Sequence, residues 1–418
     1  MLWPYPSKTE SDLEYWSLFN TLYLTRKIIN PIKKAERNSN TEEYFSKQKI
    51  VFKNSKNEEI KSTVMLSAVG DLLPNSYIHS AKDIYKEVSD FIFNSDFKVA
   101  NFEMNYDPNL PFSGSFGDIR FNAIEETFNV LMQDELKRKY DLVFTANNMC
   151  FRYGEEGIVK TLNNLDKKGI LHVGTSRSND EDQIRIVNIN GIKFAFLSYT
   201  YGTNGVKLED DKTFLVNKVR LNALNEEDQD LTMVFSNINE AKKRNVDFII
   251  ASLHWGKEYE YFPTRKQIKL AHKLCDNGVD VILGHHAHVV QPFEKYVNKI
   301  DRECFCSYSL GSITDYYTFH KSNFLVALRL TFEKGINAVG VKNTHISCCE
   351  VLPMWIKINK HNKMDTVRLI PIYGENERKN DQSILPKDLH YIKKVKKRLK
   401  LISLDNEHHN MAIRGRSD

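Results

Sequence analysis

Short apolar runs alternate along the middle of the chain with segments in which apolar residues recur every three or four positions. The first kind is typical of buried strands and the second of amphipathic helices. Strand-like runs occupy residues 63–71, 97–103, 140–148, 247–255, 279–286 and 303–311. Helix-like segments occupy residues 81–95, 123–139, 155–169, 237–246 and 264–278. This alternation predicts a layered α/β fold with mixed central sheets flanked by helices.

Turn and cap residues sharpen two of these predictions. Asn190-Gly191 joins two strand-like runs, and this dipeptide is the strongest short hairpin signal. Thr264 and Gln267 form a capping-box pattern, and Gly278 stands just past the end of the same helix-like segment. We therefore expect a hairpin in the middle of the domain and a helix with well-defined ends after it.

The alternation stops toward both ends of the chain, which divides it into three predicted parts. Residues 1–60 are a helical extension, residues 61–375 the α/β domain, and residues 376–418 a basic C-terminal tail. The apolar face of the extension is expected to pack on the domain, with a membrane-surface role as the alternative. Residues 323–335 and 361–374 are predicted to be antiparallel strands that complete a sheet edge.

The charge balance of the 418 residues is only mildly basic. The chain carries 59 Lys and Arg against 54 Asp and Glu, a formal net charge of +5, which does not favour nucleic-acid binding. Part of the excess lies in the run from Lys393 to Lys400. A solvated helix face is the favoured interpretation of this run, and contact with an anionic polymer or lipid headgroups is the alternative.

No apolar run reaches the roughly 18 residues that a membrane-spanning helix needs. The first segment, MLWPYPSKTESDLEYWSLF, has acidic residues where a signal peptide would be apolar. These observations predict a cytoplasmic protein and leave peripheral membrane association open. The six cysteines do not have the spacing of a zinc knuckle, and they are expected to be reduced core thiols.

Polar side chains follow five of the predicted strands, at the point where each strand ends. Ligands bind beyond the carboxyl ends of the strands in open α/β sheets, so these side chains are expected to converge. They are Asp71, Glu103, Asn147, Asn148, His254, His285, His286 and His288. Such donors suit one or two divalent Mn, Fe or Zn ions that act on a phosphoryl group. The His-x-His spacing lets His286 and His288 serve neighbouring ions, with His285 turned to the other side.

Several of these residues lie in motifs that resemble the CapA/PgsA family of poly-γ-glutamate capsule biosynthesis proteins, a branch of the calcineurin-like metallophosphoesterases. The resemblance covers about residues 63–320. Its longest block, SLHWGKEYEYFPTRKQIKLAHKLCDNGVDVILGHHAHVVQPFE, contains HWG-x-E-Y and G-H-H-x-H-V-x-Q-P. AVGDLLPN and ANFEMN resemble the family's G-D and N-x-E motifs. SYSLGSI resembles its Y-S-L-G-N-F motif, with Ser312 in place of asparagine.

The resemblance implies a calcineurin-like metallophosphoesterase fold and a division of the ligands between two metals. The first metal would take Asp71 and His288, the bridge would be Glu103, and the second metal would take Asn148, His254 and His286. The chain departs from the family pattern A-N-N-H-x-x-D-x-G at Met149, which replaces the histidine, and at Arg152, which replaces the aspartate. The resemblance implies that this histidine is the acid for the leaving group, and the thioether of Met149 cannot donate a proton in its place.

These observations support two functions. The first is a metal-dependent hydrolase of phosphoesters, in which His254 or His285 replaces the missing acid and Arg152 clamps an anionic group. An ordinary surface arginine is an equal alternative for Arg152. The second is an accessory protein of capsule or polyglutamate synthesis that binds metal or an anionic polymer without hydrolysis. Met149 and Arg152 favour the second function, whereas the intact histidine motifs favour metal or anion binding under either.

Overall fold

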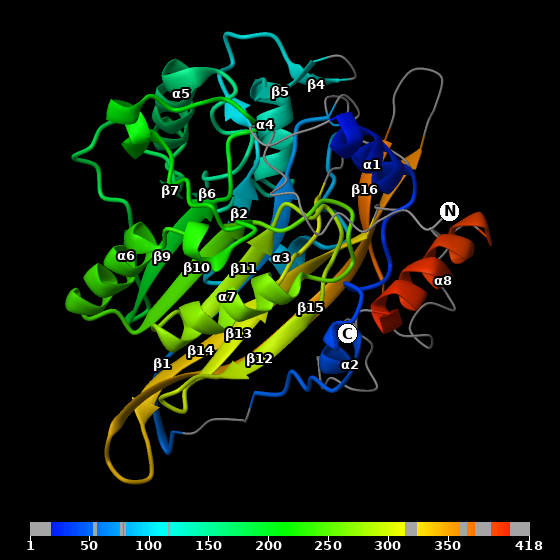
Figure 1. The fold of residues 1–418 in the computed structure, drawn as a ribbon. Coiled ribbons are helices and arrows are strands. Elements are labelled where there is room, and N and C mark those ends of the chain that lie inside the picture. Colours follow the sequence, from blue (N-terminus) through cyan, green and yellow to red (C-terminus); the bar gives the residue numbers. More distant parts are fainter. Residues whose placement is uncertain are drawn as a thin grey trace.

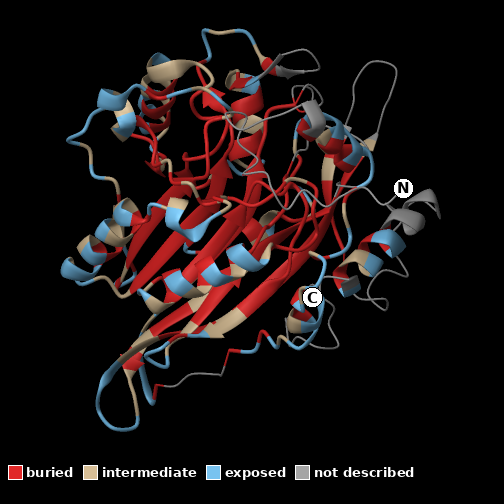
Figure 2. Cartoon of the chain, in the orientation of Figure 1, coloured by how far each residue is buried: buried red, intermediate tan, exposed pale blue. Residues whose placement is uncertain are grey.

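Two large β-sheets pack face to face in the centre of the molecule, and helices cover their outer faces (Figure 1). Figure 2 shows the strands almost entirely buried and the helices exposed along their outer sides. This computed structural model describes residues 18–52, 57–75, 78, 81–115, 118–313, 324–359, 366–372 and 386–401. The mixed sheets and flanking helices confirm the predicted fold class.

The first sheet has seven strands, of which four are parallel. In spatial order they are β16 (Thr366–Pro371), β15 (Lys342–Asn359), β14 (Phe324–Ile336), β1 (Glu59–Leu72), β2 (Phe97–Phe102), β6 (Leu142–Phe144) and β7 (Leu171–Val173). β1, β2, β6 and β7 run parallel, and β14, β15 and β16 extend the edge beside β1 in antiparallel fashion.

The second sheet has six strands, again with a parallel centre. In spatial order they are β12 (Phe293–Val297), β13 (Glu303–Ser307), β11 (Val281–His285), β10 (Phe248–His254), β9 (Ile192–Thr200) and β8 (Arg185–Ile189). The expected hairpin joins β8 to β9, with Asn190 at φ 47° and Gly191 at φ 86°. A small third sheet contains β3 (Asn105–Tyr106), β5 (Asp118–Ala123) and β4 (Ser113–Ser115).

Helices cover both outer faces of the pair of sheets. The helices of the described residues are α1 (Leu18–Ile29), α2 (Thr41–Ser46), α3 (Ser89–Phe93), α4 (Glu125–Met132), α5 (Gly154–Lys167), α6 (Thr232–Lys243), α7 (Arg265–Asp276) and α8 (Pro386–Leu401), with 3-10 turns at Asp210–Leu215 and Glu226–Asp228. α3, α4 and α5 share an apolar cluster with β2 and β6, whereas α6 and α7 pack on the second sheet. The predicted capping box of Thr264 and Gln267 begins α7.

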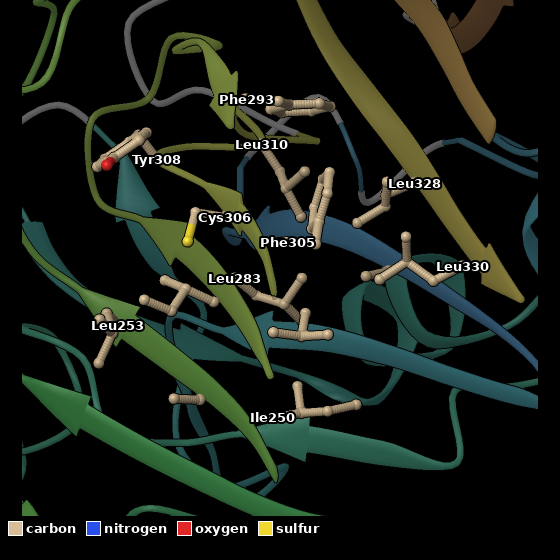
Figure 3. Close-up of a cluster of buried hydrophobic side chains, with 14 of the residues drawn as sticks. Ile250, Leu253, Leu283, Phe293, Phe305, Cys306, Tyr308, Leu310, Leu328 and Leu330 are labelled. Atoms are coloured by element: carbon tan, nitrogen blue, oxygen red, sulfur yellow. The ribbon is translucent and has the colours of Figure 1, made fainter. Parts of the chain in front are cut away.

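The main hydrophobic core fills the space between the two sheets. Figure 3 shows Leu328 and Leu330 of β14 beside Leu283 of β11 and Phe305 of β13. Ring contacts between the two sheets continue this layer. The ring centres of Phe97 and Phe196 lie 5.4 Å apart, and those of Phe194 and Phe332 lie 5.0 Å apart. The burial of these rings holds the strand ends of both sheets at a fixed separation, which is what a shared site at those ends requires.

Two predicted helices are shorter in the structure than their apolar spacing indicates. The segment at residues 81–95 is helical only over α3, because the Asp83 carboxylate accepts the backbone N–H of Tyr85 and stabilises a turn in place of a helix. α4 ends at Met132, after which Asp134 accepts the backbone N–H of Arg138 in another turn. The long strand β15 was not among the predicted elements.

Segments near the two ends of the chain pack against the same core. Ile28, Phe45 and Phe52 join the main hydrophobic cluster, and Lys27 of α1 forms a buried ion pair with Glu260 at 3.0 Å. Residues 1–17 and 53–56 of the predicted extension and residues 376–385 and 402–418 of the predicted tail lie outside the described part of the chain.

The basic run of residues 393–400 lies on α8, whose apolar side is buried. Ile392, Val395 and Leu399 join the main core, whereas Lys393, Lys394, Lys397 and Lys400 are exposed. The run is therefore the solvated face of a docked helix. No helix among the described residues is long and apolar enough to cross a membrane. None of the six cysteines, all of which the structure describes, forms a disulfide.

Candidate metal centre

The carboxyl ends of parallel strands from both sheets meet at one place. Asp71 lies at the end of β1 and Glu103 follows β2 in the first sheet, whereas His254 ends β10 in the second. Backbone hydrogen bonds join the two layers here, since Asp71 N–H donates to Gly311 at 3.0 Å. A Cβ on Gly70 would lie 1.7 Å from the Gly311 carbonyl oxygen, so this approach requires glycine.

Six carboxylate and imidazole side chains form two groups of three at this junction. One group is Asp71, Glu103 and His254, and the other is Glu258, His286 and His288. Within each group the ligand atoms lie within 4.8 Å of one another. The Nε2 atom of His288 links the groups, since it lies 3.9 Å from a carboxylate oxygen of Glu103 and 3.9 Å from one of Glu258.

Asn148 adds an amide oxygen to the first group. Its Oδ1 lies 3.0 Å from Nε2 of His254, which in turn is 3.7 Å from Oε1 of Glu103. The amide nitrogen of Asn148 points the other way and donates to the hydroxyl of Tyr201 and to Oδ1 of Asn204. These two hydrogen bonds orient the oxygen of Asn148 toward His254.

The turn after β11 places two histidines in an unusual backbone conformation. His286 has φ 81° and His288 has φ 54°, values that residues other than glycine rarely adopt. Such strain is concentrated at functional sites, where the surrounding structure enforces it. Nδ1 of His288 lies 2.7 Å from Oγ of Ser312, so its Nε2 atom faces the carboxylates. Ser312 therefore orients this ring from the position where the family motif has asparagine.

Burial sets the protonation states of the group. Desolvation lowers the pKa of His254 to about 3, although Asp71 opposes the shift, and it lowers the pKa of His286 well below the usual value. Burial would raise the pKa of Asp71, but His285 and then the other histidines hold it below its ordinary value. Neutral imidazoles beside an ionised carboxylate are the forms that bind metals.

The donor set and its buried polar atoms fit a divalent metal ion. Both ring nitrogens of His286 are buried, and neither has a hydrogen-bond partner in the described structure. A buried polar group without a partner is costly, and a metal ligand is one explanation for it. Oxygen and imidazole donors together suit Mn, Fe or Zn ions. The residues present therefore form candidate metal-binding groups.

Three residues that the sequence motifs single out belong to neither group. His285 is fully buried, with Nδ1 3.0 Å from Oδ1 of Asp71. Met149 is buried, and its sulfur accepts the amide N–H of Asn204 at 3.0 Å. Arg152 is half-buried in the turn before α5, and its Nε atom is buried without a hydrogen-bond partner among the described residues.

Two residues of the site were not predicted. Glu258 belongs to the HWG-x-E-Y motif, four residues after His254, and this carboxylate was the signal that could have identified it. Asn101 stands two residues before Glu103 in the N-x-E motif. Its amide nitrogen donates to Oδ1 of Asp71 at 2.8 Å and lies 3.3 Å from Nδ1 of His254. Asn101 therefore fixes two candidate ligands from behind.

Comparisons with known proteins find related sequences among capsule synthesis proteins. Residues 64–317 match the family model for bacterial capsule synthesis protein PGA_cap. The chain is 26% identical over 269 residues to capsule biosynthesis protein CapA of Bacillus anthracis, covering 62% of this chain and 61% of that protein. It is 29% identical over 254 residues to PGA biosynthesis protein CapA of Bacillus subtilis strain 168, covering 59% of this chain and 62% of that protein.

A third relative is matched over a shorter segment. A probable polyglutamine synthesis accessory protein of Mycobacterium tuberculosis is 35% identical over 77 residues, which is 18% of this chain and 19% of that protein. The chain spans about three-fifths of the length of the two CapA relatives.

The family match contains every candidate ligand from Asp71 to His288. It also confirms the resemblance that the sequence motifs indicated. The model match covers more than half of the chain, and the two-sheet architecture agrees with a metallophosphoesterase-like domain. The chain belongs to the bacterial capsule synthesis protein PGA_cap family.

Proposed function

We propose that this protein is a metal-dependent hydrolase of phosphoester-type bonds that serves capsule or poly-γ-glutamate synthesis. The observation that carries the proposal is the pair of ligand groups that meet at His288, between Glu103 and Glu258. The names of the CapA relatives support the biological setting. The geometry of the ligands supports the chemistry, because two adjacent groups of this kind suit phosphoryl transfer to water.

The ligands divide between two sites in this proposal. Glu258, His286 and His288 hold one ion, Asp71, Glu103, His254 and Asn148 hold the other, and Glu103 lies between them. In this division His286 and His288 bind the same ion, and Glu258 is an additional ligand. The family motifs instead imply that His286 and His288 bind different ions. When bound, one or two Mn, Fe or Zn ions would supply Lewis acidity and neutralise charge on the phosphoryl group.

The chain's own residues decide which substrates such a centre could cleave. His254 is held between Asn148 and Glu103, and His285 lies buried behind Asp71, so neither is placed to protonate a leaving group. Met149 has no proton to give. The geometry therefore supports a substrate whose leaving group departs without protonation. Arg152 offers a guanidinium for an anionic group of that substrate.

A second candidate function is an accessory protein that binds metal or an anionic polymer without cutting it. The observation that favours it is the packing of Met149, whose sulfur accepts a hydrogen bond from Asn204 where the family motif has an acid. The printed name of the Mycobacterium tuberculosis relative, an accessory protein, is in line with this candidate.

A hydrolysis assay separates the two candidates. The wild-type protein and a Glu103→Gln variant would be loaded with Mn²⁺, Zn²⁺ or Fe²⁺ and supplied with bis(p-nitrophenyl) phosphate, whose leaving group needs no acid. The hydrolase predicts metal-dependent release of p-nitrophenol that Glu103→Gln abolishes. Metal binding without release by either protein would overturn the hydrolase and favour the accessory role.

A further inference from the structure

The loop after β10 reaches the metal centre at two neighbouring residues. A carboxylate oxygen of Glu258 lies 3.9 Å from Nε2 of His288, and the ring of Tyr259 is stacked on the same imidazole, with ring centres 5.7 Å apart. The backbone N–H of Tyr259 donates at 2.8 Å to the carbonyl of Ala287, which stands between the two histidines of the turn after β11. The position of this loop therefore sets how Glu258 and His288 face each other.

A segment of the N-terminal extension holds the other side of this loop. The backbone N–H of Ile32 donates to the carbonyl of Tyr259 at 2.8 Å, and the N–H of Tyr261 donates to the carbonyl of Ile32 at 2.9 Å. Ile32 is thereby paired in parallel with Glu260. Tyr259 has φ 56°, a conformation that residues other than glycine rarely adopt and that persists only when neighbouring structure enforces it. The extension supplies part of that enforcement.

Lys27 of α1 fixes the same loop through its side chain. Its ammonium lies 3.0 Å from Oε1 of Glu260, and the side chains of the pair are 7% and 2% exposed. Glu260 also attracts the buried ammonium of Lys257. On the opposite side, the carbonyl of Glu260 accepts the side-chain N–H of Gln291 at 2.7 Å. Glu260 is therefore held between the extension and the core domain, two residues after the candidate ligand Glu258.

We propose that Lys27 and Ile32 position the loop of residues 256–261 at the metal centre, so that Glu258 and the ring of Tyr259 meet His288. Both residues precede the family match, which begins at residue 64 and contains the candidate ligands. The extension thus contributes to a site whose ligands lie in another part of the chain. Lys27 is a positioning residue, since it acts on Glu258 through Glu260. The inference rests on the proposed function only in taking the two ligand groups as a metal centre.

Charge and position predict opposite effects when Lys27 is replaced. Burial is the main cause of the lowered pKa of His286, and the ammonium of Lys27 contributes to it. Removing this ammonium would therefore strengthen the binding of a cation if charge alone mattered, whereas loss of positioning would weaken it. The double variant Lys27→Met/Glu260→Gln removes one charge of each sign. Its net charge equals that of the wild type, so it reports the effect of position.

Calorimetric titration of the full chain with Mn²⁺ or Zn²⁺ measures this effect. Lys27→Met/Glu260→Gln is expected to bind metal about tenfold more weakly than the wild type, since residues that orient metal ligands contribute about 10–100-fold. Lys27→Arg, which keeps the ion pair, should retain most of the affinity. Hydrogen exchange of the Tyr259 and Tyr261 amides in the metal-free protein should be faster in the double variant. Lys33→Gln is the matched control, because this lysine of the same segment is exposed.

Thermal melting separates positioning from a general loss of stability. Weaker metal binding by a double variant that melts close to the wild type supports the proposal. If the double variant does not fold, Lys27→Met takes its place, because its charge effect opposes the predicted loss and weaker binding is then equally diagnostic.

Four outcomes would overturn the proposal. They are no metal binding by the wild type, equal or tighter binding by the folded variant, unchanged exchange of the two amides, and an equal loss in Lys33→Gln. Weaker binding by the variant stands even if the wild type does not hydrolyse bis(p-nitrophenyl) phosphate. Conversely, hydrolysis by a variant with unchanged affinity would remove the positioning role and leave the hydrolase, so the two failures are distinguishable.

Discussion

The imidazole of His285 lies behind the carboxylate of Asp71, with Nδ1 3.0 Å from Oδ1. The backbone N–H of His286 donates to the other oxygen at 3.1 Å, and Asn101 donates to Oδ1 at 2.8 Å. All of these groups are buried. The carboxylate is therefore held from several directions, and the first histidine of the G-H-H-x-H motif has the geometry of a positioning residue for Asp71.

His285→Ala is expected to lower the affinity for Mn²⁺ or Zn²⁺ by about 10–100-fold, because residues that orient metal ligands typically contribute this much. His285→Asn, which restores a polar partner for Asp71, should recover part of the loss. His254→Ala should be more severe than either, since it removes a candidate ligand. Calorimetric metal titration measures all three, with thermal melting to establish that each variant is folded. Unchanged affinity in His285→Ala would remove the positioning role.

Glu258→Gln is expected to reduce the amount of metal that the protein retains. The variant keeps the size of the side chain but removes the negative charge that accompanies His286 and His288. Elemental analysis after dialysis should show a loss of about one ion per chain in a two-ion centre. Glu227→Gln is the control, since this glutamate is exposed. Equal metal content in the wild type and Glu258→Gln would show that Glu258 is not a ligand.

The convergence of Asp71, Glu103 and His254 could be predicted because each directly follows or ends a buried parallel strand, and such ends share one edge of a sheet. The division into two sheets could not be predicted, since local patterns do not record which strands become neighbours. The structure brings the site together from both sheets, with β1 and β2 on one side and β10 and β11 on the other.

Residues on loops were harder to predict than residues at strand ends. Glu258 reaches the site from the loop after β10, and its role depends on how that loop returns toward His288. The shortened helix at α3 shows the same limit, since side-chain hydrogen bonds such as that of Asp83 compete with apolar periodicity.

Stability of the metal-free protein is expected to fall as the pH decreases below the ordinary histidine pKa. Burial lowers the pKa of His172, with Asp166 opposing the shift, so the unfolded chain binds a proton that the folded chain does not. Stability is therefore full above about pH 6.5 and decreases below it. Urea unfolding of wild type and His172→Gln across this range should give a flatter pH dependence in the variant. Parallel curves would contradict the shift.

Met149→His is expected to restore proton donation to the leaving group. The rate for an alkyl phosphodiester should rise by up to about 10²–10⁴-fold, the usual contribution of a general acid. The rate for bis(p-nitrophenyl) phosphate should change little, because its leaving group departs unprotonated. Met149→Leu is the control for altered packing near Asn204. A similar change for both substrates would indicate a general disturbance of the site instead of an added acid.

Arg152→Gln is expected to lower kcat/KM for an anionic substrate by about 10–100-fold while metal content stays unchanged. The guanidinium has a buried Nε atom without a hydrogen-bond partner among the described residues, and a charge-assisted hydrogen bond to substrate is worth about 1.5–3 kcal/mol. Arg152→Lys keeps the charge but not the planar fork, so it should recover only part of the activity. Arg120→Gln is the control. The guanidinium of Arg120 lies 5.2 Å from the centre of the ring of Tyr153, the residue that follows Arg152. Equal kcat/KM in wild type and Arg152→Gln would leave Arg152 as an ordinary surface residue.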